Sequence, residues 1–163
     1  MINNNKLQEP MATYLALKKP VNLLMQLLSD AKLLPIPTNL ASDYDLLTIT
    51  RRGLPKKSLV DLSKNISITL HELAGILHIS ERTLQRYDAN EVLKTEYSEK
   101  AVELARLYAH GTEVFGSLEN FIAWMKTPSM VFKNETPISL LDTIVGFNLI
   151  FQELGRIEHG VFS

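Results

Sequence analysis

The residues best suited to chemistry lie in one segment, LHELAGILHISERTLQRYDA, residues 70–89. Its second half carries hydroxyl, amide and guanidinium groups at close spacing. Arginine donates hydrogen bonds to guanine or to phosphate, glutamine pairs with adenine, and serine or threonine bonds to phosphate oxygens. Displayed on the outer side of one helix, such groups would bind DNA. The candidate DNA contacts are Ser80, Arg82, Thr83, Gln85 and Arg86.

Two short helices would have to position these side chains. Thr69 and Glu72 form a capping box, in which each side chain accepts a hydrogen bond from the other residue's backbone N–H. Ser80 can cap a second helix, and Ile79 before it can pack against Leu84 as a hydrophobic staple. Two short helices joined by a tight turn predict a helix-turn-helix.

The apolar positions agree with that motif. Ala74 supplies the small residue that a close helix crossing requires, and Leu73 and Leu77 flank it on the buried side. One position departs from the pattern, because His78 stands where the turn usually has glycine. Histidine tolerates a left-handed conformation better than a β-branched residue does, at some cost relative to glycine. From these residues alone, a DNA-binding motif and a purely structural helix pair both remain open.

Charge is distributed unevenly along the 163 residues. The net charge is −1, but residues 51–100 hold nine basic and seven acidic residues, whereas residues 101–163 hold four and seven. This asymmetry indicates different partners for the middle and the end of the chain. Some basic residues near the motif could bind phosphate or simply form a solvated face: Arg51, Arg52, Lys56, Lys57 and Lys64.

Composition also indicates a compartment. The chain has no Cys, which excludes disulfides and thiolate metal sites. No apolar run approaches the roughly 18 residues that a membrane-spanning helix needs. The N-terminal MINNNKLQEP lacks the basic-then-apolar layout of a secretory signal. We therefore expect a cytoplasmic protein with no membrane contact.

Catalytic patterns find no support. His71, His78, His110 and His159 are scattered, without the i, i+4 spacing of a helical metal site. No Gly-x-Ser-x-Gly elbow and no phosphate-binding Gly-rich loop occurs. We therefore expect a protein that is not an enzyme, with no metal and no cofactor.

The rest of the chain favours an all-α fold. No stretch alternates β-branched or aromatic residues between turns, and apolar spacings of three and four recur instead. We interpret residues 35–45 as a linker. Before the helix-turn-helix, we predict one or two helices within 12–34, one that begins before Arg51 and is interrupted by Gly53-Leu54-Pro55, and one over 56–64. After it, we predict a helix from Thr95 or Ser98 to near Gly111 and another that Ser117 caps and that ends before Pro128. A short helical turn at Pro137 and a last helix capped by Thr143 complete the prediction.

Several blocks follow the helix-turn-helix in a specific order: ARLYAHGTEVFGSLENFIAWMKTP, PISLLDTIVGF and GRIEHGVF. Together with Gly53-Leu54-Pro55 and ELAGILHISERTLQR, they resemble the Xre/ParS-type antitoxins, also called the MbcA/ParS/Xre group. These antitoxins are partners of RES-domain toxins. The resemblance covers about residues 51–163 and is far more specific than one helix-turn-helix.

The resemblance implies an antitoxin of a type II toxin-antitoxin system. RES toxins consume NAD+ or use it to modify a protein, and the antitoxin covers the entrance to the NAD+ site without chemistry of its own. Its helix-turn-helix would bind operator DNA and repress its own operon, as a homodimer within a larger toxin-antitoxin complex. The implied units are an N-terminal helical extension and linker (1–50), an Xre-like helix-turn-helix domain (51–113) and a small helical toxin-binding domain (114–163).

Two apolar residues, Val161 and Phe162, stand just before the final Ser163, although termini are usually polar. A short tail can bury them only by folding back, and an exposed apolar end is typical of a partner-binding surface. Physics alone leaves both options equal, and the resemblance favours the partner. The predicted toxin contacts are Leu140, Leu141, Asp142, Arg156, Glu158, His159, Gly160, Val161 and Phe162.

The alternative hypothesis is a helix-turn-helix regulator, or a helical dimerisation module, without a toxin partner. A gel shift with the promoter of its own gene would separate these, because a dimerisation module gives no salt-sensitive specific shift. Residues 1–50 match nothing in the family that would assign them a role.

Overall fold

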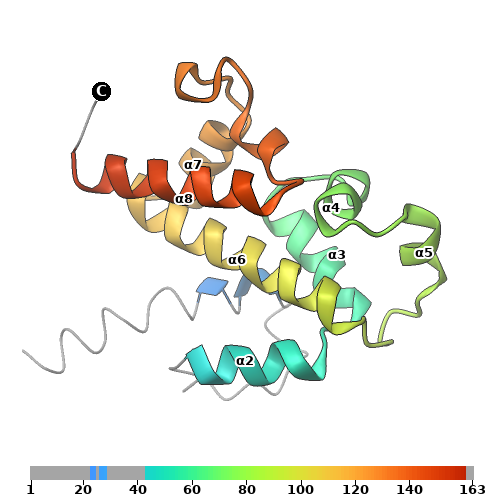
Figure 1. Ribbon diagram of the computed structural model, residues 1–163. Helices are drawn as coiled ribbons and strands as arrows, with labels where there is room; N and C mark the ends of the chain where they lie inside the picture. The colour runs from blue at the N-terminus through green and yellow to red at the C-terminus, as the bar shows by residue number, and fades with distance from the viewer. Residues whose placement is uncertain (1–22, 25, 29–42, 161–163) are drawn as a thin grey trace, which may run out of the picture.

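A computed structural model describes residues 23–24, 26–28 and 43–160 (Figure 1). The described ranges contain no strand, only two isolated bridges, Pro55 with Val92 and Ser129 with Glu135. The predicted all-α fold is therefore confirmed. The helices are, in order, α2 (Asp43–Arg52), α3 (Lys56–Asn65), α4 (Leu70–Leu77), α5 (Glu81–Arg86), α6 (Thr95–Phe115), α7 (Leu118–Met125), the 3₁₀ helices η2 (Met130–Phe132) and η3 (Pro137–Leu140), and α8 (Ile144–Glu158).

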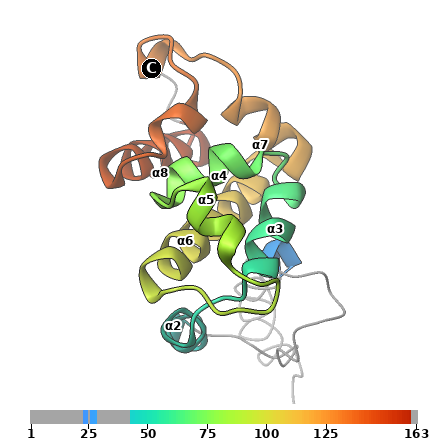
Figure 2. The same ribbon diagram turned by 90° about the vertical axis from the view of Figure 1, so that its right-hand side faces the viewer.

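The long helix α6 is the centre of the molecule. It runs between α2 on one side and α7 and α8 on the other, and α3 and α4 also contact it (Figures 1 and 2). Its buried side chains, such as Leu104 and Tyr108, join one hydrophobic core with residues of α3 and α8. The boundary expected between residues 113 and 114 falls inside α6, so both units of the chain share this helix.

Helix α6 is longer than the sequence predicted. We expected it to end near Gly111, and this expectation is wrong, because α6 continues to Phe115 and ends at Gly116 with φ +77°. Gly111 instead allows α7 to approach closely: a Cβ at this position would lie 2.4 Å from the ring of Phe121. Ser117 then caps α7 by accepting a hydrogen bond from the backbone N–H of Asn120 (3.1 Å).

The predicted interruption at residues 53–55 is confirmed. Gly53 has φ +83°, and a Cβ there would lie 2.5 Å from Cγ1 of Val92, so only glycine fits. The backbone N–H of Leu54 donates to Oγ of Ser98 (2.8 Å), and its carbonyl accepts from Leu93 N–H (2.9 Å). The break therefore anchors α2 and α3 to the segment that precedes α6.

The N-terminal predictions lie mostly outside the described residues. Within 12–34, residues 23–24 and 26–28 are helical, and Leu24, Leu27 and Leu28 are buried in the core. Helix α2 begins at Asp43, inside the expected linker 35–45.

Candidate functional site

Helix α4 begins with the predicted capping box. Oγ1 of Thr69 accepts from Glu72 N–H (3.1 Å), and Oε2 of Glu72 accepts from Thr69 N–H (2.7 Å). The bond from the backbone of Thr69 lowers the pKa of Glu72, because it stabilises the ionised carboxylate. This local arrangement sets where the helix-turn-helix begins.

His78 closes the turn in the expected left-handed conformation, with φ 57° and ψ 37°. Its backbone N–H donates to Gly75 O (3.2 Å), and Ile79 N–H donates to Ala74 O (3.0 Å), which ends α4. The side chain has a role that the sequence did not reveal. Nε2 of His78 donates to the backbone oxygen of Asp142, in the loop before α8.

Helix α5 displays the predicted DNA-binding side chains. Leu84 is 3 % exposed and anchors the helix, whereas Arg82, Gln85 and Arg86 are exposed to solvent. The helix lies at the outer edge in Figure 1 and faces the viewer in Figure 2. In Figure 2 no other described helix lies in front of α5.

The hydroxyl groups at the start of α5 are bound to each other and to the backbone. Oγ of Ser80 accepts from Thr83 N–H (3.0 Å) and lies 2.7 Å from Oγ1 of Thr83. Both residues are exposed. Nδ1 of His71 lies 2.6 Å from Oε1 of Glu81, which ties α4 to the first residue of α5.

Lys56 holds the other end of α5. Its Nζ donates to the backbone oxygens of Tyr87 (2.7 Å) and Gln85 (3.3 Å). An ammonium group satisfies carbonyls that a helix leaves unpaired at its C-terminal end. The sequence offered only phosphate binding or a solvated face for Lys56. The structure adds a third role, positioning the helix that carries Arg82 and Arg86.

Some of the predicted toxin contacts are exposed to solvent in the structure, and others are buried. Leu141 is 1 % exposed and packs in the hydrophobic core, so its side chain is not at the surface of the free protein. The sequence could not distinguish it from Leu140, which is half-buried. Asp142 is exposed and lies beside the helix-turn-helix through its bond from His78.

The remaining predicted contacts lie at the end of α8. Arg156 is half-buried and pairs with Glu153 (Nη1 to Oε2, 3.3 Å). Glu158, His159 and Gly160 are exposed, and Gly160 has φ +66°. Two further predicted contacts lie outside the described residues: Val161 and Phe162.

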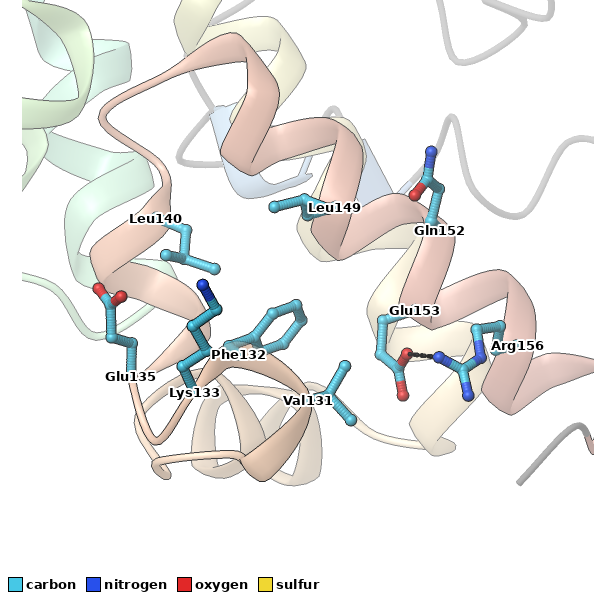
Figure 3. A pocket seen from close by; sticks show the side chains of 9 residues that line it. All are labelled: Val131, Phe132, Lys133, Glu135, Leu140, Leu149, Gln152, Glu153 and Arg156. Atoms are coloured by element: carbon cyan, nitrogen blue, oxygen red, sulfur yellow. Dashed lines mark ion pairs between the residues drawn. The ribbon is translucent and has the colours of Figure 1, made fainter. Parts of the chain in front are cut away.

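A groove of about 420 Å³ lies beside these residues, between α8 and the segment that contains η2 and η3 (Figure 3). Leu149, Gln152 and Arg156 project from α8 along one wall. Val131, Phe132, Lys133, Glu135 and Leu140 form the other side. Sequence reasoning missed this groove, because its two walls lie on separate segments of the chain.

Neither a metal-ion cluster nor a helix able to span a membrane was found among the described residues. These residues contain no cluster of three or more His, Asp or Glu that could hold a metal ion. Within the same ranges, no helix combines the length and apolarity that crossing a bilayer requires.

Comparison with known proteins agrees with this arrangement. Residues 45–106 match a family described as the antitoxin Xre-like helix-turn-helix domain. Residues 110–160 match the antitoxin Xre/MbcA/ParS C-terminal toxin-binding domain. The chain belongs to the Xre/MbcA/ParS family of antitoxins. This confirms the family resemblance, and a toxin-binding domain implies a toxin partner.

Three relatives illustrate the match. An Xre antitoxin of Yersinia enterocolitica is 33% identical over 99 residues, which is 60% of this chain and 67% of the relative. An Xre antitoxin of Photorhabdus laumondii is 30% identical over 128 residues, 76% of this chain and 84% of the relative. A Prs ADP-ribosylating antitoxin of a Sphingobium strain is 25% identical over 133 residues, again 76% and 84%.

The family places the two surfaces of this antitoxin in separate units. Helix α5 falls in the helix-turn-helix match, which implies DNA binding, and the groove falls wholly in the toxin-binding match. Both matched families are binding domains of antitoxins rather than catalytic domains.

Proposed function

We propose that this antitoxin neutralises a RES-type, NAD+-consuming toxin by covering its active-site entrance, and that it represses its own operon through α5. One observation carries the proposal. The helix-turn-helix presents uncovered guanidinium groups, and the toxin-binding unit beside it presents uncovered apolar side chains. A single protein thus offers DNA and a protein partner two chemically different surfaces.

Use of NAD+ by the toxin is supported by the name of one relative. The Sphingobium protein is a Prs ADP-ribosylating antitoxin. ADP-ribosylation transfers ADP-ribose from the substrate NAD+, and we infer that this reaction belongs to the toxin paired with that antitoxin. We extend the same substrate to the toxin of the present antitoxin, which itself holds no NAD+ and performs no reaction.

DNA contact is assigned to α5. Arg82, Gln85 and Arg86 reach bases or phosphates, and the Ser80 and Thr83 hydroxyls bind phosphate. An Xre-like unit of residues 51–113 acts as a homodimer, which matches the two-fold symmetry of an operator. Bacterial DNA lies in the cytoplasm, so an antitoxin that binds its own operator works there.

Toxin contact is assigned to the C-terminal unit, residues 114–163. Its contacts are Leu140, Asp142, Arg156, Glu158, His159 and Gly160, together with Val161 and Phe162 beyond the described residues. These residues cover the entrance of the NAD+ site.

The test combines growth, NAD+ content and DNA binding. The toxin encoded beside the antitoxin gene is induced in bacteria with and without the antitoxin. We expect the toxin alone to deplete cellular NAD+ and stop growth, and co-expression to restore both. Purified antitoxin should also shift its own promoter in a salt-sensitive manner.

The outcomes separate the two candidate functions. A specific promoter shift without any effect on a neighbouring toxin would favour a helix-turn-helix regulator that has no toxin partner. The observation that favours this second candidate is the exposed row of donors on α5, which needs no toxin to bind DNA.

A further inference from the structure

Exposed apolar side chains line both walls of the groove of Figure 3. Among the described residues, Val131 is 48 % exposed and Leu149 44 %. Val145, 67 % exposed, lies four residues before Leu149 on the same side of α8, and Met130, 83 % exposed, precedes Val131. Exposed apolar residues on both walls of a groove mark a binding site more often than a scattered exposed residue does.

The floor of the groove is held rigidly. Phe132 is 7 % exposed, and its ring meets Trp124 edge-on at a centroid distance of 6.1 Å. The turn that follows is closed by hydrogen bonds from Ser129 N–H to Glu135 O (3.0 Å) and from Asn134 N–H to Ser129 O (2.8 Å). The wall carrying Val131 is therefore formed before any partner binds.

The two walls are also fixed relative to each other. Gly146 lies so close to η3 that a Cβ would lie 1.7 Å from the backbone oxygen of Leu140. Thr143 caps α8 by accepting from Gly146 N–H (3.0 Å), which sets the direction of the helix. A preformed site loses little conformational entropy on binding, so more of its contact energy becomes affinity.

The charges along the groove favour an apolar occupant. Glu153 and Arg156 pair with each other, and the Glu153 side chain is only 14 % exposed. Because the pair is already formed, an apolar side chain entering the groove leaves neither charge unpaired, which would otherwise be costly. Lys133 and Glu135 also line the groove, but both are exposed, so their charges remain hydrated.

We propose that this groove is the docking site for an apolar segment of the toxin, which inserts between Val131 and Leu149. The occupant is a toxin rather than a second copy, since all nine lining residues fall inside the match to the toxin-binding domain. This proposal rests on the proposed function and adds a preformed anchor separate from the C-terminal tail.

The experiment measures binding of the full-length antitoxin to the toxin encoded beside it, made catalytically inactive, by titration calorimetry. We expect Leu149→Glu and Val131→Glu each to weaken binding about thirtyfold or more, because a buried unpaired carboxylate replaces a central apolar contact. Leu149→Met keeps the contact apolar and should bind within threefold of the wild type.

Leu47→Glu is the matched control. Leu47 is 39 % exposed on α2, close to the 44 % of Leu149, and α2 lies at the opposite end of the molecule (Figure 1). It should bind toxin as the wild type does. Circular dichroism and size-exclusion chromatography on every variant report folding and self-association.

The outcomes are distinct. If Leu149→Glu and Val131→Glu remain folded and bind toxin within threefold of the wild type, the groove is not the docking site. If they instead abolish self-association and leave toxin affinity unchanged, a second copy occupies the groove and the proposal is overturned. If the wild type itself has no affinity for the toxin, the proposed function fails, and the groove proposal fails with it.

Discussion

Nε2 of His78 donates a hydrogen bond to the backbone oxygen of Asp142, although 64 residues separate them in the chain. His78 is in the turn of the helix-turn-helix, and Asp142 precedes the helix that forms one wall of the groove. Nζ of Lys126 makes a second link of this kind, to the backbone oxygen of Ser67. The DNA-binding and toxin-binding units are therefore joined at their polar edges as well as through the common core.

Two substitutions at His78 distinguish the contribution of its side-chain hydrogen bond to stability from the cost of its left-handed backbone conformation. His78→Ala should lower the free energy of unfolding by about 1 kcal/mol, because it removes the bond to Asp142. His78→Gly should be nearly neutral, since relief of left-handed strain, about 1 kcal/mol, offsets the lost bond. Urea unfolding measures both. An alanine variant as stable as the wild type would show that the bond contributes nothing.

Arg82 and Arg86 should dominate operator affinity. The double variant Arg82→Ala, Arg86→Ala should bind the promoter about thirtyfold or more weakly, because each contact with a base or phosphate contributes about 1–3 kcal/mol. Gel shifts over a range of salt concentrations measure the affinity of each variant for the promoter. Arg106→Ala, an exposed arginine on α6, is the control and should leave affinity unchanged. Unchanged affinity in the double variant would mean that α5 is not the recognition helix.

Lys56 should affect DNA binding without contacting DNA. Lys56→Met keeps the apolar stem but loses the bonds to Gln85 O and Tyr87 O, so α5 is held less firmly. We expect operator affinity to fall about fivefold, while the slope of its salt dependence stays the same because no phosphate contact is lost. Lys56→Arg should restore affinity. A slope reduced by about one unit in Lys56→Met would instead assign Lys56 to phosphate.

Acid should weaken the start of α4 through Glu72. Its pKa is lowered from the ordinary value of 4.5, mainly by the bond from Thr69 N–H. The stabilisation is therefore present above the unfolded pKa and is lost as pH falls through the folded pKa. In Glu72→Gln the free energy of unfolding should fall less between pH 7 and pH 3 than in the wild type, as measured by urea titration. Equal falls in both proteins would exclude this contribution.

The C-terminal tail should matter for the partner rather than for folding. Deletion of residues 160–163 leaves His159 as the last residue. Both His159 and the deleted Gly160 are exposed, so the deletion removes no described core residue. We expect unchanged thermal unfolding and dimerisation but impaired toxin neutralisation in the co-expression assay. Unfolding of the truncated protein would place Val161 and Phe162 in the core, as their apolar character alone would also allow.

The start of several helices could be predicted from the amino-acid sequence, because capping depends on residues only three positions apart. Thr69, Ser80, Ser117 and Thr143 were each expected to cap a helix, and each accepts a hydrogen bond from the N–H three residues later. The exposed side of α5 could also be predicted from the sequence. The helical repeat places the other side chains of α5 relative to Leu84, which is buried.

Which of several neighbouring residues are exposed and which are buried could be read only from the folded structure. Leu141 is buried while Leu140 lines a groove, and Gly111 continues a helix that its residue type would end. Lys56 reaches the carbonyls of α5 rather than standing free. In each case the environment of the side chain depends on packing between segments far apart in the chain. Helical periodicity and capping involve only residues close in sequence, so they cannot predict such contacts.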